Sequence, residues 1–322
     1  MRKSTHTLIA ALLTALTLLA ACSSQSAPSN NSTTSNTPLI TKDANGTAIV
    51  IPAQKPMRIV SLGATDSEIL GAIVNPDRVV GVDYYTDYPT TLTSKTKVSD
   101  VNGNYNVEAI IGLQPDLVLS FGGETATTDK QLEQSNINVV DLPAGDITES
   151  LLEIRLVGQL THDTTKADAL VSSMQQTITT VKSEVANLPK KTVYMEVDYS
   201  TPGKPYVFGQ GSFGDQLIAI ANGINIFGGN SSGGGYPQVT DEAVIAQNPQ
   251  VIILTEDPNY GGNPSLVYTR QGWGNVAAVQ SKSVYSIPSD LMQRPGPRIV
   301  LGLEMLAHDM YPNQVPAPTT NG

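Results

Sequence analysis

Short apolar runs alternate with amphipathic stretches along most of the chain. From residue 57 onwards, "RIVSL", "RVVGV", "DLVLSF" and "INVVDL" have the β-branched composition of buried strands. Between them, "TDSEILGAI", "VEAIIGL" and "KQLEQSN" have the apolar spacing of helices. Strands that alternate with helices of this length are typical of βαβ units around a mostly parallel sheet. We therefore expect an α/β lobe over residues 57–163.

The same order recurs after Thr192. The runs "TVYMEV", "YVFG", "QVIILT" and "SVYSI" predict strands, and "FGDQLIAIAN", "DEAVIAQ" and "RIVLGLEMLAHDM" predict helices. This pattern indicates a second α/β lobe over residues 190–312. The proline-rich residues 313–322 are expected to form a loose tail.

One long amphipathic helix is predicted between the two lobes. Apolar residues recur there at spacings of three and four within a polar stretch: Leu170, Met174, Ile178, Val181, Val185 and Leu188. The helix should begin at Thr164 or Thr165 and stop at Pro189, and the linking segment is therefore residues 164–189. The expected fold is therefore two similar α/β lobes with mostly parallel central sheets, joined by one long α-helix.

The N-terminal segment has the features of a secretory signal. Two basic residues, Arg2 and Lys3, precede an apolar run that is too short and too interrupted for a spanning helix of ~20 apolar residues. Residues 1–21 are thus predicted to be a signal peptide. "LAAC" resembles the lipoprotein box of bacteria, in which the cysteine, here Cys22, carries the lipid. An ordinary signal followed by a stray thiol is the alternative. Residues 22–45, rich in Ser, Thr and Asn, are expected to be a disordered tether.

Charge and cysteine content narrow the possible partners. The chain has 19 basic and 29 acidic residues, which gives a net charge of −10. Nucleic acid is therefore not expected as a partner, because phosphate binding requires a basic face. Cys22 is the only cysteine, so disulfides and cysteine chemistry are excluded from the rest of the chain. We expect no metal site and no cofactor of the protein's own.

One unit of the sequence occurs twice. "NVEAIIGLQPDLVLSF", residues 106–121, is matched by "TDEAVIAQNPQVIILT", residues 240–255. Asn106 and Thr240 are good N-cap residues, which places Glu108 and Glu242 in the first turns of two equivalent helices, one in each lobe. A single acid at such a position stabilises its helix by ~0.3–1 kcal/mol and needs no other role.

An ordered set of motifs allows a family resemblance to be stated. "RIVSLGATDSEILGAIVNPDRVVGV", "YYTDYP", the repeated unit and "PGPRIVLGLEML", together spanning residues 57–311, resemble the cobalamin and ferric-siderophore class of substrate-binding proteins of ABC importers. The resemblance implies a monomer that captures a ferric siderophore, haem or cobalamin between its lobes and delivers it to the importer. The metal would belong to the ligand. It also implies that Glu108 and Glu242 form ion pairs with arginines on the two transmembrane subunits.

Candidate ligand residues follow from the fold and from the resemblance. Ligands of open α/β sheets bind beyond the carboxyl ends of the strands, where this chain has several aromatic residues and also Arg270 and Trp273. Leu291 and Met292 stand where cobalamin-binding members have aromatic side chains, so the ligand class stays open. The candidates are Tyr85, Phe121, Tyr236, Tyr260, Asp290, Leu291, Met292, Gln293 and Arg294.

Two short motifs leave rival functions open. "GQGSFG", residues 209–214, matches a dinucleotide fingerprint, but its place deep in the second lobe favours a tight strand-to-helix turn. "GNSSG", residues 229–233, matches a nucleophile pattern without a following helix. The rivals are a secreted α/β hydrolase that uses Ser231 or Ser212 with His308, and an adhesion or signalling receptor without a permease. No enzymatic activity is expected.

The signal segment generates the first testable prediction. If Cys22 carries the lipid, the Cys22→Ser variant should be released from membranes or remain unprocessed, because a lipid anchor would then be missing. Fractionation of cells followed by immunoblotting measures this. Unchanged membrane retention of the variant would contradict the lipoprotein prediction.

Overall fold

The computed structural model describes residues 40–143, 145–257 and 262–319. The predicted signal peptide, Cys22, most of the predicted tether and Tyr260 lie outside the described residues. Both predicted lobes belong to one compact unit, which covers the described residues.

The first lobe is built on a five-stranded sheet in the order β3-β2-β1-β4-β5, with every described pairing parallel. Its strands are β1 (Ile59–Ser61), β2 (Val79–Val82), β3 (Thr96–Lys97), β4 (Leu117–Phe121) and β5 (Val139–Leu142). Its helices are α1 (Ala64–Ile73), α2 (Val107–Gly112), α3 (Ala126–Gln134), α4 (Ile147–Thr161) and the 3-10 helix η1 (Pro76–Arg78). The central strands are almost entirely apolar and buried, as parallel strands covered on both faces must be.

The second lobe has a similar sheet in the order β10-β9-β6-β7, with β8 also paired to β6. Only the β6–β7 pairing is antiparallel among the described strands. The strands are β6 (Lys191–Asp198), β7 (Tyr206–Val207), β8 (Gly223–Asn225), β9 (Val251–Leu254) and β10 (Val284–Ser286). The helices are α6 (Phe213–Ile220), α7 (Ser232–Gly235), α8 (Asp241–Gln247), α9 (Pro264–Val267), α10 (Ala277–Gln280), α11 (Ser289–Met292), α12 (Ile299–Met310) and the 3-10 helix η2 (Trp273–Asn275).

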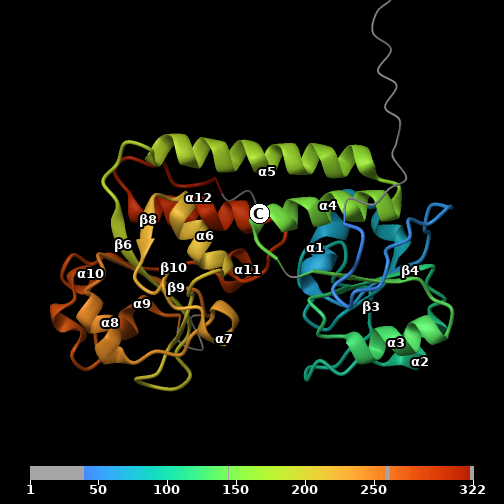
Figure 1. The fold of residues 1–322 in the computed structure, drawn as a ribbon, viewed down its shortest axis with the longest axis horizontal. Coiled ribbons are helices and arrows are strands. Elements are labelled where there is room, and N and C mark those ends of the chain that lie inside the picture. The colour runs from blue at the N-terminus through green and yellow to red at the C-terminus, as the bar shows by residue number, and fades with distance from the viewer. Residues whose placement is uncertain (1–39, 144, 258–261, 320–322) are drawn as a thin grey trace, which may run out of the picture. The chain divides into compact units, whose positions relative to one another are not determined.

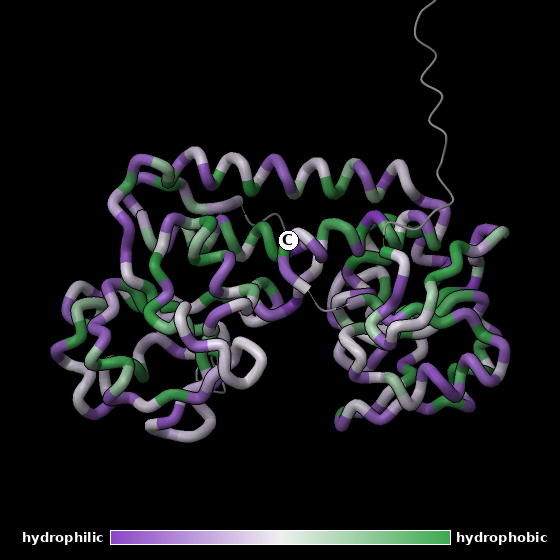
Figure 2. The backbone as a smooth tube through the Cα atoms, in the orientation of Figure 1, coloured by the Kyte–Doolittle hydropathy of each residue, from purple (hydrophilic) through white to green (hydrophobic). Residues whose placement is uncertain are grey.

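The helix α5 (Thr164–Val185) joins the two lobes, as the sequence predicts (Figure 1). It packs against α1 and α4 of the first lobe and against α6 and α12 of the second. Its buried stripe includes Val171, Met174, Val181 and Val185, and Figure 2 shows hydrophobic and hydrophilic residues alternating along it. One continuous apolar cluster contains residues of both lobes and of α5. The predicted fold class is thus confirmed.

Several elements are absent from the sequence prediction, most of them short helices of three or four residues. The largest is α4, which begins with a capping box in which Asp146 and Glu149 satisfy each other's backbone N–H groups. The strands β3 and β8 are two and three residues long, too short for a periodic pattern. The helix α4 packs against α5, so on the side of the first lobe the connection between the lobes consists of two packed helices.

Both ends of the described chain are more ordered than the sequence suggests. Asn45, in the predicted tether, donates through Nδ2 to Asp129 and Asp141, at 3.1 Å in each case. In the predicted loose tail, Val315 is 3% exposed and its carbonyl oxygen lies 2.8 Å from Nδ1 of His308. The tether and the tail therefore begin farther from the lobes than expected.

Two carboxyl groups are buried in the first lobe without a hydrogen-bond partner among the described residues. Both side-chain oxygens of Asp66 on α1 and of Glu153 on α4 are unpartnered. Burial, and then the charge of Glu149, raises the pKa of Glu153 to about 8. Burial, and then the charge of Glu153, raises the pKa of Asp66 well above its ordinary value. An ionised carboxylate at either position costs free energy of folding.

We expect the Glu153→Gln variant to unfold at a higher temperature than the wild type at pH 8, with a smaller difference at pH 5. The raised pKa means that Glu153 contributes stability below its ordinary pKa of 4.5 and loses this contribution as the pH rises towards 8. By pH 7 the loss is on the order of 3 kcal/mol. Thermal unfolding across this pH range measures it. Glu133→Gln, at an exposed site on α3, is the control, and equal shifts in both variants would contradict the prediction.

Candidate functional site

A cavity of about 520 Å³ lies at the carboxyl ends of the strands of the first lobe. Its wall is formed by the segments that follow β1, β2 and β4 and by a loop that ends at Tyr105, and Arg294 of the second lobe also lines it. Because βα loops of a parallel sheet converge at this edge, it is where the fold is expected to bind a ligand. Tyr85, Phe121 and Arg294, three of the predicted ligand residues, line the same cavity.

The loop after β2 presents an aromatic side chain to the cavity. Asp83 is 5% exposed and holds the loop, since its carboxylate accepts from the Tyr85 N–H at 2.9 Å and from the Thr86 hydroxyl at 2.5 Å. The Tyr85 hydroxyl donates to the carbonyl of Val101 at 2.5 Å. The Tyr85 ring remains 51% exposed and packs edge-on against Tyr84, with ring centroids 5.2 Å apart. A rigid, half-exposed aromatic face is thus available to a ligand.

The loop after β4 forms a second part of the wall. Gly122 and Gly123 both have positive φ, at 72° and 75°, a conformation that favours glycine. The N–H of Gly123 donates to Asp141 at 3.2 Å, which leaves Phe121 and the exposed Glu124 lining the cavity. Burial raises the pKa of Asp141 to about 6. Glu124, on this loop, and Tyr105, at the end of the loop before α2, both line the cavity and were missed in the sequence.

A group of five charged side chains connects the lobes beside the cavity; we call it the interlobe ion group. It consists of Glu68 and Asp87 of the first lobe and Asp290, Arg294 and Arg298 of the second. Arg298 contacts Glu68 at 2.5 Å, and Arg294 contacts Asp87 at 2.6 Å and Asp290 at 3.0 Å. The Glu68 side chain is only 1% exposed, so its charge depends on these arginines. Burial would raise the pKa of Asp87, but the hydrogen bond and charge of Arg294 hold it below its ordinary value.

Two neighbouring residues show that the strand ends of both lobes meet here. Gln293 donates through Nε2 to the carbonyl and hydroxyl oxygens of Thr255, directly after β9, at 3.1 Å. Arg294, the next residue, reaches Asp87 of the first lobe. The carboxyl edges of the two sheets therefore face the same region.

The other predicted ligand residues are placed differently. Leu291 and Met292 are 6% and 0% exposed and belong to the apolar core, because Gly302 of α12 allows their backbone and side chains to pack closely. Ligand contact by these two buried side chains stays a prediction. Tyr236 is half-buried against Phe208, with ring centroids 5.6 Å apart. Ligand contact by the residues that line the cavity stays a prediction.

The two repeated glutamates occupy equivalent positions. Asn106 accepts from the N–H of Ala109 at 2.9 Å and caps α2, and Thr240 caps α8 in the same way through Ala243 at 3.3 Å. Glu108 and Glu242 are exposed, and within the part of the chain that the structure describes neither forms a salt bridge. In Figure 1, α2 and α8 lie at the ends of their lobes that are remote from α5.

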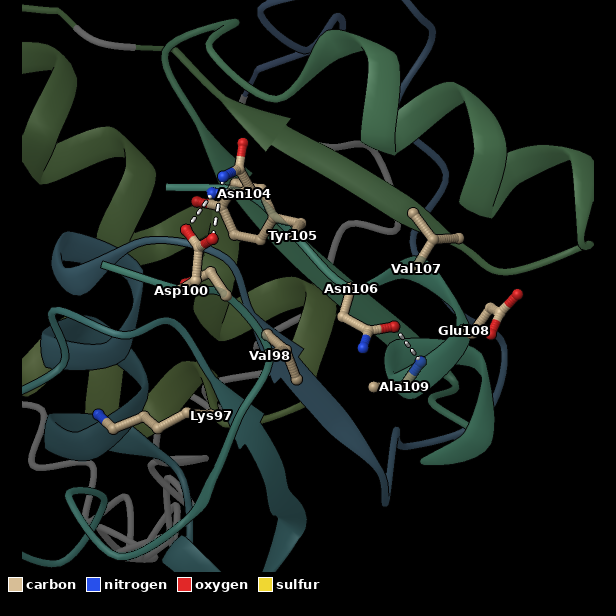
Figure 3. A pocket seen from close by; sticks show the side chains of 10 residues that line it. Lys97, Val98, Asp100, Asn104, Tyr105, Asn106, Val107, Glu108 and Ala109 are labelled. Carbon is tan, nitrogen blue, oxygen red and sulfur yellow. Dashed lines mark hydrogen bonds between the residues drawn. The ribbon is translucent and has the colours of Figure 1, made fainter. Parts of the chain in front are cut away.

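A hollow adjoins each of these glutamates. The hollow beside Glu108 has a volume of about 610 Å³, and the one beside Glu242 about 690 Å³. Figure 3 shows the first, in which Asn104 donates to Asp100 and the Glu108 carboxylate points away from the other labelled side chains. Each lobe thus combines an acid in a helical first turn with an adjacent concave surface.

Arg270 and Trp273 belong to the second lobe's interior and not to the ligand cavity. Arg270 forms two contacts with Glu196, at 2.6 and 2.7 Å, and lies 3.5 Å from the ring centroid of Tyr199. Trp273 is fully buried. Arg270 and Tyr199 also line the hollow beside Glu242, where the Tyr199 hydroxyl donates to Asp241 of α8 at 2.8 Å.

A family model for periplasmic binding proteins matches residues 59–291. This match covers both lobes and the helix between them. The chain belongs to the periplasmic binding protein family. That family consists of solute-binding proteins, and a cavity at the strand ends is where such a fold is expected to hold a solute.

Relatives of this periplasmic binding protein cover nearly its whole length. It is 32% identical over 314 residues, 94% of this chain and 96% of the relative, to an uncharacterized ABC transporter substrate-binding lipoprotein, YvrC, of Bacillus subtilis strain 168. It is 27% identical over 280 residues, 85% of this chain and 74% of the relative, to a cobalamin-binding protein of Halobacterium salinarum. A crystal structure of a possible iron-binding periplasmic solute-binding protein from Staphylococcus epidermidis matches with a TM-score of 0.70 and 29% identity, over 80% of this chain and 100% of the other.

The side chains of the rival hydrolase have other partners in this periplasmic binding protein. Ser212 is 2% exposed, and its hydroxyl donates to Gly209 at 2.7 Å and caps α6. His308 lies against Val315. The "GQGSFG" glycines form the expected strand-to-helix turn, since a side chain at Gly209 would collide with Asn230. Among the described residues, no helix has the length and apolarity to cross a membrane, and no cluster of three acids, histidines or cysteines is arranged for a metal.

We expect the Arg298→Ala variant to lose about 2 kcal/mol of unfolding free energy. The substitution leaves Glu68 buried with only Arg294, at 3.6 Å, to balance its charge. Urea denaturation at constant slope measures the loss. Arg155→Ala removes an exposed pair with Asp168 and should cost about 0.5 kcal/mol or less. Equal losses in the two variants would show that the interlobe ion group does not stabilise the fold.

Proposed function

We propose that this protein is an extracytoplasmic solute-binding lipoprotein. It captures a ferric siderophore, haem or cobalamin between its lobes and delivers this ligand to an ABC importer. The observation that carries the proposal is the cavity at the strand ends of the first lobe, to which the second lobe contributes Arg294. A site shared by two lobes encloses a ligand that neither lobe could bury alone.

The lining of the cavity supports a bulky ligand with a flat or apolar portion. Tyr85 and Phe121 offer aromatic surface at two different loops, and Tyr105 also lines the cavity. The relative from Halobacterium salinarum is named a cobalamin-binding protein, and the crystal structure from Staphylococcus epidermidis is described as possibly iron-binding. Cobalamin combines a metal with a large organic frame, and we propose that iron would reach this site within a chelate of similar kind.

Glu108 and Glu242 are proposed to dock the protein on the two transmembrane subunits of the importer. Both acids are exposed and equivalent, and the two helices lie on the ends of the lobes away from α5. The N–H of Glu242 itself, and then Thr240, lower the pKa of Glu242, so this side chain carries its charge at neutral pH. Charge pairs of this kind control orientation and the rate of encounter more than affinity.

A lipid on Cys22 is proposed to hold the protein at the outer side of the cell membrane. The lipoprotein box in the sequence supports this location, and the Bacillus subtilis relative is named a lipoprotein. A tethered receptor stays close to its importer, which raises the effective concentration for docking. The protein is proposed to act as a monomer in this setting.

The proposal is tested by ligand binding and import in parallel. Isothermal titration calorimetry with cyanocobalamin, haem and a panel of ferric siderophores should identify one class that binds at one molecule per protein. Import of that ligand by cells that express the importer should require the protein. Absence of binding to every member of the panel would contradict the proposed function.

We expect Glu108→Ala and Glu242→Ala to reduce import while ligand affinity stays within about twofold of the wild type. Neither residue lines the ligand cavity, and each removes one proposed charge pair with the importer. The double variant should lose more than either single variant, and lysine at these positions should be worse than alanine. Glu133→Ala, also exposed on the first lobe, is the control and should import normally. Normal import by both alanine variants would contradict the proposed docking role and leave the two glutamates with only their role at the start of a helix.

A further inference from the structure

The charge of the cavity restricts the ligand that it can accept. Three charged side chains line the cavity: Asp83, Glu124 and Arg294. Arg294 is already matched, since it contacts Asp87 at 2.6 Å and Asp290 at 3.0 Å. The guanidinium of Arg294, the one basic group among the lining residues, is therefore already paired with acids of the protein. Glu124 forms no salt bridge among the described residues.

The sum of the neighbouring charges is negative. In the interlobe ion group, three acids face two arginines, which leaves one negative charge. Asp83 and Glu124 add two more, and Lys97, whose ammonium group donates to the carbonyls of Asp83 and Thr86, removes one. Two negative charges remain. Asp66 is not counted, because it is buried and among the described residues its carboxylate has neither a hydrogen-bond partner nor a salt bridge. Glu68 and Asp290 are counted, because Arg294 and Arg298 contact them.

Acidic residues also follow the strands of the second lobe. Asp198 ends β6, and Glu256 and Asp257 follow β9, at the edge where Gln293 contacts Thr255. Lys204, in the connection between β6 and β7, is the basic residue on that side. Arg270 does not contribute, because Glu196 matches its charge in the interior of the lobe. Acidic residues thus outnumber basic ones at the strand ends of the second lobe, although of this lobe only Arg294 lines the cavity itself.

An anionic ligand would meet two costs here. It would be repelled by the surplus carboxylates, and it would gain a cation only if Arg294 left Asp87 and Asp290. A neutral or positively charged ligand meets neither cost, and a positive charge would be attracted to Glu124.

We propose that the ligand is a metal chelate of neutral or positive net charge, and that Glu124 contributes to this preference. A ferric trihydroxamate or an uncharged corrinoid fits, whereas a ferric tricatecholate and haem, with its two propionates, do not. The inference rests on the proposed function, because it concerns the ligand of the same cavity. It adds the charge class, which neither the fold nor the family determines.

The test uses pairs of closely related probes whose main difference is their charge. One pair is a linear ferric trihydroxamate with a terminal amine and the same complex after succinylation of that amine. The other pair is cyanocobalamin and its derivative in which one propionamide is hydrolysed to the acid. Haem and a ferric tricatecholate complete the panel. Calorimetric titration of the full-length protein should show the amine or amide member of a pair binding about two- to fivefold more tightly, with a smaller difference at high salt.

Three variants separate the cavity from the overall charge of the protein. Glu124→Gln should reduce the preference between the members of a pair. Asp87→Asn should reduce it too, because it releases Arg294 for an anion. Glu184→Gln makes the same charge change on α5, which contributes no residue to the cavity, and should leave the preference unchanged.

The outcomes distinguish the inference from the function beneath it. Tighter binding of the anionic member, or binding of haem or the tricatecholate alone, would overturn the charge class while leaving solute capture intact. An equal reduction by Glu124→Gln and Glu184→Gln would overturn the role of Glu124. If no probe bound, the proposed function would fail, and the inference with it.

Discussion

The apolar stripe of α5 is the constraint on which the rest of the structure depends. This helix covers both lobes at once, and its buried side chains join the two lobes in one apolar cluster. A helix kinks sharply only where its backbone hydrogen bonds are disrupted, whereas extended connections allow hinge motion through a few torsions. The lobes are therefore held at a nearly constant separation. Contacts between the two lobes, such as the salt bridge of Arg298 with Glu68, form within the protein itself.

This rigidity assigns different tasks to different edges of the lobes. The carboxyl edges of both sheets meet at Gln293 and Arg294, where the aromatic loops form the proposed solute site. The first turns of α2 and α8 carry the exposed acids, on the ends away from α5. Since α5 limits lobe closure, recognition by an importer would rely on the fixed spacing of Glu108 and Glu242 more than on a large change of shape.

Local patterns were sufficient for most of the secondary structure. The strands of the two sheets are short β-branched runs between polar turns, and both N-caps of the repeated unit form the hydrogen bonds that their residue types predict. The helix α5 was predictable because its apolar spacing persists for 22 residues. The signal for α4 was also present, in the capping box of Asp146 and Glu149 and in its apolar face. Only two residues separate α4 from α5, and one of them, His162, adopts a left-handed conformation. The two helices therefore follow each other almost directly along the chain, which made the boundary between them hard to predict.

The sequence by itself determined the two α/β lobes, the helix between them, the matched glutamates and the candidate loops, because each depends on residues near one another in the chain. Only the tertiary structure decided which side chains of those loops face the cavity. Leu291 and Met292 turn into the core, where Gly302 makes room for them, and Arg270 turns towards Glu196. Arg294 meets Asp87, which is 207 positions away. The orientation of a loop side chain and the balance of charge around it are set by contacts between distant segments, and periodicity carries no information about these.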